Sequence, residues 1–418
     1  MKKAFWILFA ILPVIVLILV GCAGQGPTTV PKTTAPVTTA TPPGAPPATA
    51  APPTAAETPI KIGALISLTG AGQIVGPSQK ANLEFALEQI GSQAAGRKVQ
   101  LIMEDDATDP TTGIDKAKKL LQFDKVDVIL GPIHGAVGAA VANFMGTTGT
   151  PEIIWREKPI EILKGGNNLF LPFGTENGLS YYLGSYVYDK MGYKTAIVAY
   201  EDFLAGVNMT QGAAAIFEKK GGTITQKVPI APNTMDFSPF LSSMKQADCV
   251  IYWFTPPLAQ RFTAQYLASG MKMPLVLVLA PQLTSKALAD MGDKALGIVG
   301  SSHYSFLIDT PINKAYVDSF TKKYGFNLLM EQGLDSYITF NMFIEAVKAT
   351  KGDTAPAKTI EALKNIKMDT PAGMVSFTPG RLGIGDYYLS KVSKLDDGSI
   401  NWKVFDKYSQ VPQDTPAQ

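Results

Sequence analysis

The sequence predicts an α/β protein whose folded part is divided into two lobes, each built on a parallel, doubly wound sheet. Short apolar runs alternate with longer segments of helical period from residue 60 onward, and this alternation is typical of parallel sheets covered by helices. The alternation is too long for one ordinary sheet and restarts near Thr195, which indicates a second lobe. A chain of 418 residues is long enough for two domains with substantial cores.

The predicted strands are short apolar runs, and the predicted helices between them repeat apolar residues at helical spacing, as Leu83, Ala86, Leu87 and Ile90 do. We expect strands at Ile60–Ser67, Val99–Glu104, Val126–Leu130, Glu152–Trp155, Thr195–Tyr200, Thr223–Val228, Cys249–Phe254, Leu275–Leu279 and Gly297–Ser301. We expect helices at Ser78–Ile90, Thr112–Gln122, Ala136–Met145, Leu179–Met191, Gly206–Lys220, Pro257–Ser269 and Thr284–Met291.

After Thr310 the pattern becomes mostly helical and then ends in a β-rich tail, which we expect to pack onto the earlier lobes. The predicted elements of this region are helices at Ile312–Tyr324, Leu334–Ala349 and Ala357–Asn365, then strands at Gly373–Phe377, Tyr387–Val392 and Trp402–Asp406.

The N-terminus has the pattern of a bacterial lipoprotein signal. Lys2 and Lys3 precede an apolar run from Ala4 to Val20, as in a secretory signal peptide, although a retained membrane anchor is the alternative. Leu19-Val20-Gly21-Cys22 resembles a lipobox, in which the cysteine is lipidated and becomes the mature N-terminus. We therefore predict a signal peptide over residues 1–22, lipidation of Cys22 and anchoring to a membrane.

Residues 23–59 are rich in Pro, Thr and Ala and contain no aromatic residue. Such a segment cannot bury enough apolar surface to offset its ordering entropy, and its prolines favour extended polyproline II. We expect a disordered tether that holds the folded part away from the membrane.

Composition and motifs exclude several classes of function. The net charge of +2 and the scattered Lys and Arg residues argue against a nucleic-acid partner. Two cysteines and two histidines, without metal-ligand spacing, predict no metal and no cofactor. No nucleophile elbow or P-loop occurs, adjacent Asp105 and Asp106 point to opposite faces of a strand, and Cys249 lies within an apolar strand. We therefore predict that the protein is not an enzyme.

Several ordered motifs resemble those of the Leu/Ile/Val-binding type of periplasmic binding protein, the substrate-binding proteins of ABC transporters. The resemblance covers residues 60–408 and rests on Ile60–Gly70, Glu104–Pro110, Ile129–Pro132, Tyr200–Asp202, Thr310–Val317 and Thr370–Gly373. It implies two Rossmann-like lobes that close on a ligand about three hinge crossings, the switching mode of this class.

The resemblance also implies lobe boundaries. Lobe 1 is expected at residues 60–172 and 304–373, lobe 2 at residues 174–302 and 376–408, and a disordered tail at residues 409–418. The crossings are expected near Pro172–Thr175, Ser301–Tyr304 and Met374–Ser376.

The resemblance places a ligand carboxylate at the loop that contains His134, Gly135 and Ala136. This loop precedes a predicted helix, whose first N–H groups and dipole favour an anion. The serine that the family usually has near Gly135 is missing, and His134 stands beside that position. His134 is either a ligand contact or a structural hydrogen-bonding residue.

A second predicted pocket segment follows the strand at Glu152. Here Trp155 is expected to form an apolar wall, and Arg156 and Lys158 are expected to bind a carboxylate; a solvated charged turn is the alternative. If Arg156 binds the ligand, Arg156→Ala is expected to weaken binding about tenfold and to leave the melting temperature of the empty protein nearly unchanged.

Lobe 2 is expected to contribute Ala205, Phe254 and Gln282. Neither Pro281 nor Gln282, where the family's acidic partner of an amino-acid ammonium should fall, is acidic. A zwitterion would lose hydration there without gaining a partner, so we favour a small organic acid over a plain branched-chain amino acid, with neutral amides next.

We therefore expect an extracytoplasmic, lipid-anchored solute-binding protein of a branched-chain-amino-acid-type ABC importer, which binds a small organic acid or an amino-acid-like solute between its lobes. Its expected partners are this small-molecule ligand and an ABC permease. A lipoprotein that senses the ligand and signals to a membrane partner is the alternative.

Overall fold

The computed structural model describes residues 58–412 except residue 157. The predicted signal peptide, Cys22 and residues 23–57 of the predicted tether lie outside the described residues, as do residues 413–418. None of the described helices is long and apolar enough to cross a membrane.

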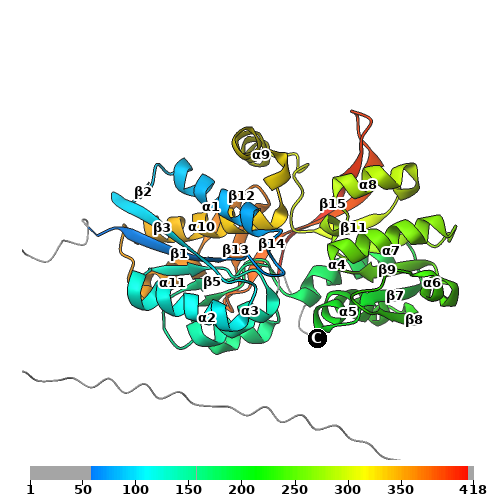
Figure 1. Cartoon of the computed structure of the whole chain (residues 1–418), viewed down its shortest axis with the longest axis horizontal. Coiled ribbons are helices and arrows are strands. Elements are labelled where there is room, and N and C mark those ends of the chain that lie inside the picture. The colour runs from blue at the N-terminus through cyan, green and yellow to red at the C-terminus, as the bar shows by residue number, and fades with distance from the viewer. Residues whose placement is uncertain (1–57, 157, 413–418) are drawn as a thin grey trace, which may run out of the picture. The chain divides into compact units, whose positions relative to one another are not determined.

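The first sheet has six strands among the described residues, in the order β2-β3-β1-β4-β5-β6 (Figure 1). All neighbours run parallel except β2 and β3. The strands are β1 (Ile60–Ile66), β2 (Gln93–Ala94), β3 (Arg97–Asp105), β4 (Val128–Leu130), β5 (Glu152–Ile153) and β6 (Leu169–Phe170).

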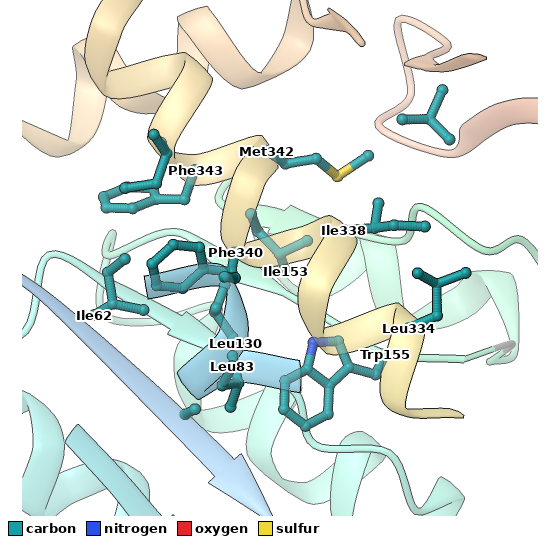
Figure 2. Packing of buried hydrophobic residues seen from close by; sticks show 14 of the residues in the cluster. Ile62, Leu83, Leu130, Ile153, Trp155, Leu334, Ile338, Phe340, Met342 and Phe343 are labelled. Carbon is teal, nitrogen blue, oxygen red and sulfur yellow. The ribbon is translucent and has the colours of Figure 1, made fainter. Parts of the chain in front are cut away.

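Helices cover both faces of this sheet, and we call the sheet with these helices lobe 1. On one face, a core cluster packs β1 and β4 against α1, α9, α10 and α11. On the other face, a second cluster packs the same strands against α2 and α3. Figure 2 shows the first cluster, in which Trp155 lies beside α10 with Leu334 and Ile338. The helices are α1 (Gly76–Gln89), α2 (Pro110–Lys119), α3 (Gly135–Met145), α9 (Pro311–Tyr324), α10 (Glu331–Ala349) and α11 (Pro356–Lys364).

The second sheet has nine strands among the described residues, in the order β12-β13-β14-β11-β10-β9-β7-β8, with β15 paired to β14. Strands β8, β7, β9, β10 and β11 are parallel, and the later strands are antiparallel. The strands are β7 (Thr195–Glu201), β8 (Thr223–Ile230), β9 (Cys249–Trp253), β10 (Leu275–Leu277), β11 (Val299–Ser302), β12 (Lys367–Thr370), β13 (Gly373–Phe377), β14 (Gly383–Lys394) and β15 (Ile400–Pro412).

Helices also cover both faces of the parallel part of this sheet, which with them forms lobe 2. Cluster contacts place α4 and α5 on one face and α6, α7 and α8 on the other. These helices are α4 (Glu176–Asp189), α5 (Leu204–Lys219), α6 (Ser238–Ser243), α7 (Pro256–Ala268) and α8 (Ser285–Met291). The prediction of two doubly wound α/β lobes is confirmed.

Helix boundaries follow capping chemistry that is readable in the sequence. The Thr310 side chain accepts a hydrogen bond from the Asn313 N–H, and Pro311 occupies the first turn of α9. Asp109 caps α2 in the same way, and Pro110 follows it. A side-chain cap satisfies an N–H group that has no partner within the helix. Proline in the first turn has no N–H of its own that would need such a partner.

The predicted crossings can be compared with the packing of the described residues. The segment between β6 and α4 and the segment after β11 connect the two lobes, near the positions predicted for two of the crossings. The third differs, because Phe377 and Leu382 pack with lobe 1 cores, whereas Leu389 packs with a lobe 2 core. We therefore propose a boundary within β14 rather than at Met374–Ser376.

The first four residues of the predicted disordered tail are in a strand. Residues 409–412 belong to β15, and Val411 and Pro412 pair with Gly385 and Ile384 of β14. The alternating pattern of a half-exposed edge strand is weak in this segment, so local patterning contains little signal for the extension.

Cys249 is a buried free cysteine in β9, as predicted. Burial raises the pKa of its thiol to about 12, and the charge of Asp248 contributes. A thiol that stays protonated at neutral pH is a poor nucleophile.

Candidate functional site

The carboxyl ends of β1 and β3 are tied together by two acidic side chains. The Asp105 carboxylate accepts hydrogen bonds from the N–H groups of Leu68 and Thr69 and, at 2.6 Å, from the Thr69 hydroxyl. The Asp106 carboxylate accepts a hydrogen bond from the Ser67 hydroxyl at 3.2 Å. Both aspartates therefore fix the loop that precedes α1, and they bind different partners rather than each other.

The loop between β4 and α3 leads into the N-terminus of a helix. His134 is the N-cap residue of α3, and its side chain forms no capping hydrogen bond. Gly135 and Ala136, which form the first turn, are exposed. The first N–H groups of an α-helix have no acceptor within the helix, so this turn offers donors and a positive dipole end.

His134 is the titratable group of this loop. Desolvation by the surrounding protein lowers its pKa, and the charge of Lys158 lowers it further, whereas the charge of Asp106 raises it. The net shift of the pKa is downward from the ordinary value of 6.5, so the imidazole is neutral at pH 7.

Trp155 lies in the core of lobe 1. It is fully buried, and its indole Nε1 donates a hydrogen bond to the Thr339 hydroxyl at 2.7 Å. Figure 2 shows the ring beside Leu334 of α10. The side chain therefore packs β5 against α10, and it is not among the residues that line the cavity described below.

Arg156 is buried between two carboxylates of α10. The residue is 7% exposed, its Nη2 lies 3.4 Å from Glu331 Oε2, and its Nη1 lies 3.3 Å from Asp335 Oδ2. This burial contradicts the alternative of a solvated charged turn. The two ion pairs also overturn the expectation that Arg156→Ala leaves the empty protein's melting temperature unchanged, because the substitution leaves buried carboxylates without their cation.

Lys158 connects the two predicted pocket loops. Its Nζ donates hydrogen bonds of 2.8 Å to the carbonyl oxygens of Ile133 and Trp155, and the residue is 1% exposed. Its aliphatic chain lies against Gly138 of α3, where an added Cβ would be 2.7 Å from Lys158 Cε. The lysine therefore holds the His134 loop to the segment after β5.

The predicted lobe 2 residues are separated by the fold. Ala205 is half-buried in the first turn of α5, and Gln282 is buried in a short 3₁₀ turn after β10. Phe254 is fully buried after β9, where its ring contacts the rings of Phe237 and Phe262. These positions lie at the carboxyl ends of parallel strands, where α/β sheets bind ligands, but the Phe254 ring belongs to the lobe core.

A cavity of about 530 Å³ is lined by residues of both lobes, among them residues of the turn after β10 that contains Gln282. This volume suits a small organic molecule. None of the nine predicted ligand contacts lines the cavity. Two of their neighbours do: Pro281, which precedes Gln282, and Glu331, which pairs with Arg156. The lining residues are Ile74, Ala280, Pro281, Leu283, Thr284, Ser285, Lys286, Ser302, Tyr304, Ser305, Phe306, Phe326, Asn327, Leu329, Met330, Glu331, Gln332, Ser390, Asn401 and Trp402.

No group of three or more acidic, histidine or cysteine side chains among the described residues, 58–156 and 158–412, could hold a metal ion. Sequence reasoning missed the cavity residues, several of which come from the segment before α10 and from β14 and β15, where no ligand-binding motif was recognised. The acidic partner was sought only near Pro281, whereas Glu331 supplies a carboxylate to the same cavity from lobe 1.

Two lobes of this topology, with a cavity lined by both, are the architecture of a solute-binding protein. Residues 59–399 match the family described as periplasmic binding protein, and the chain belongs to this family. Its members are the extracytoplasmic solute-binding proteins of ABC transporters, which are not enzymes, and the resemblance predicted from the sequence motifs is confirmed.

Individual relatives agree with this assignment. The chain is 25% identical to Leu/Ile/Val-binding protein homolog 6 of Brucella suis over 81% of this chain and 89% of that protein. An ABC transporter substrate-binding protein from Sphaerobacter thermophilus is 28% identical with a TM-score of 0.81, over 85% of this chain and 99% of that one. A Rhodopseudomonas palustris solute-binding protein in complex with 3,4-dihydroxybenzoic acid is 25% identical with a TM-score of 0.74, over 85% and 98%.

Proposed function

We propose that this protein is the solute-binding component of an ABC importer and that its solute is a small organic acid with an aromatic or branched apolar body. The single observation that supports this best is the cavity of about 530 Å³, which is lined by both lobes and combines apolar and aromatic walls with polar and charged side chains. The 3,4-dihydroxybenzoic acid in complex with the Rhodopseudomonas palustris relative is an acid of this kind.

In this proposal the carboxylate of the solute extends from the cavity to the first turn of α3, whose residues do not themselves line the cavity. The N–H groups around Gly135 and Ala136 are available there, and Lys158 adds a positive charge close to the same loop. Arg156, whose guanidinium is paired with Glu331 and Asp335, contributes less than a free arginine would. It acts mainly by orienting Glu331 at the cavity wall.

Closure of the two lobes about the crossings accompanies binding in this proposal, because a solute that touches both lobes stabilises the arrangement in which both contacts form. Small-angle scattering should show a smaller radius of gyration at saturating solute. An unchanged radius would contradict closure.

We also propose that Cys22 carries lipid and that residues 23–59 tether the folded part to the membrane. The lipobox-like Leu19-Val20-Gly21-Cys22 supports this. Mass spectrometry of the mature N-terminus tests it: a lipidated Cys22 is expected, and an intact Met1 would contradict it. Neighbouring permease and ATPase genes would favour an importer over a sensory lipoprotein, and their absence would favour the sensor.

A thermal-shift screen of the full chain tests the proposed solute class. A solute that binds only the folded form raises the melting temperature, because it stabilises that form by about 2.7 kcal/mol at a hundredfold excess over Kd. We expect aromatic and branched organic acids to raise it, and their neutral amides to raise it less. Stabilisation by amino acids alone would overturn the preference for an organic acid.

A further inference from the structure

Two buried polar atoms at the cavity have no hydrogen-bond partner within the described part of the chain. One is Oε1 of Glu331, a residue that is 6% exposed and lines the cavity. The other is Oγ of Ser390, which is 1% exposed and lines the same cavity. Burying a polar atom without a partner is costly, and a carboxylate oxygen is among the costlier cases, so these two atoms require an explanation.

The carboxylate of Glu331 is oriented rather than free to turn. Its other oxygen, Oε2, lies 3.4 Å from the Arg156 guanidinium, which also contacts Asp335 on the next turn of α10. Because Arg156 engages Oε2, Oε1 keeps its lone pairs for another donor.

The remaining walls of the cavity favour an aromatic body. The rings of Phe306 and Phe326 meet edge to face with centroids 5.2 Å apart. Trp402 is 8% exposed, and its indole N–H is already donated to the Leu283 carbonyl oxygen at 3.0 Å, so the ring offers apolar contact to the cavity.

We propose that the solute is a hydroxylated aromatic acid whose hydroxyl group donates a hydrogen bond to Glu331 Oε1, with Ser390 Oγ as the partner of a second polar group. This inference rests on the proposed function and assigns the solute class more narrowly. A hydroxyl group has one donor, which matches the one unpartnered carboxylate oxygen of Glu331, and Ser390 Oγ can donate to or accept from a second polar group. An ammonium group has three donors and would require further acceptors.

Calorimetric titration of the full chain with benzoate, 4-hydroxybenzoate and 3,4-dihydroxybenzoate tests the inference. We expect both hydroxylated acids to bind about tenfold more tightly than benzoate, as a hydrogen bond to a charged acceptor gives. In Glu331→Gln, the amide oxygen turns to Arg156 because arginine only donates, so the amide NH₂ replaces Oε1. The phenol hydroxyl can then only accept a neutral hydrogen bond from that NH₂, so the preference for the hydroxylated acids should fall well below tenfold.

Asp335→Asn is the matched control. It removes an ion pair to the same arginine at nearly the same distance and burial, but Asp335 does not line the cavity. It should therefore change the affinity for all three acids by a similar factor and keep the tenfold preference. Ser390→Ala is a second variant: it deletes an unpartnered buried atom, so the fold should be kept while 3,4-dihydroxybenzoate loses affinity relative to benzoate.

The outcomes separate this inference from the proposed function. If benzoate binds as tightly as its hydroxylated forms, or if the full tenfold preference survives in Glu331→Gln, the inference is wrong while the organic-acid function stands. If none of the three acids binds and phenylalanine does, both the organic-acid function and the hydroxyl assignment are wrong. If none of the four compounds binds, the proposed function itself is contradicted.

Discussion

Replacing Arg156 with alanine should destabilise the empty protein markedly. The guanidinium is paired with Glu331 and Asp335, whose side chains are only 3% and 4% exposed. Removing one partner of a buried ion pair costs about 3–5 kcal/mol, because the remaining charge is left without compensation. With an unfolding entropy of about 2.1 cal/mol/K per residue and a folded part of roughly 350 residues, this corresponds to a fall in melting temperature of about 4–7 °C.

Differential scanning calorimetry of the ligand-free chain measures this effect. Lys164→Ala is the matched control, because Lys164 also pairs with an acid, Glu161, but at 3.9 Å with both side chains mostly exposed. Exposed ion pairs contribute little, so the melting temperature of this variant should stay at the wild-type value. If Arg156→Ala melts within about 1 °C of the wild type, the two buried ion pairs do not stabilise the fold and the reasoning fails.

Three further substitutions test the loops around the site. Gly138→Ala brings a Cβ within 2.7 Å of Lys158 Cε, and this overpacking should destabilise the protein by about 1–3 kcal/mol in urea unfolding; an unchanged midpoint would contradict the contact. The pKa of His134 is lower in the folded than in the unfolded protein, so the unfolding free energy should fall as the pH falls below the unfolded pKa of about 6.5 and level off below the folded pKa. His134→Gln should remove this part of the pH dependence. Trp155→Phe removes the 2.7 Å hydrogen bond to Thr339 and should cost about 1–3 kcal/mol, which thermal unfolding would detect; equal stability would assign no role to the bond.

Local patterns in the sequence predicted most elements of the fold. Strand Gly373–Phe377 was predicted at its observed bounds, and α9 and α11 each begin one residue before the prediction. These segments have a clear period, and the two helices also have capping or proline signals at their starts. The two-residue strands β2 and β6 and the short helix α6 were missed, because such short elements have no measurable period.

The site could be predicted only in part, because its chemistry depends on contacts between segments far apart in the sequence. The position of His134 at the start of α3 follows from local pattern. The burial of Arg156 does not, since its partners Glu331 and Asp335 lie 175 and 179 residues later. The local sequence around Arg156 does not indicate burial, because both carboxylates that pair with it come from the distant helix α10.

The same limit applies to the cavity. Ser390 and Trp402 lie on antiparallel strands added to the edge of β11, and no local signal indicates that they face Glu331's cavity. Reasoning by resemblance sought the acidic residue at one position of the family pattern. The structure supplies an acid from the opposite lobe.

Equilibrium dialysis of the full chain against 4-hydroxybenzoate, with mass spectrometry of the recovered solute, tests the central claim most directly. We expect saturable binding of one solute molecule per chain and recovery of the solute chemically unchanged. Absence of saturable binding would contradict the organic-acid assignment, and a chemically altered solute would contradict the conclusion that this protein binds its solute without transforming it.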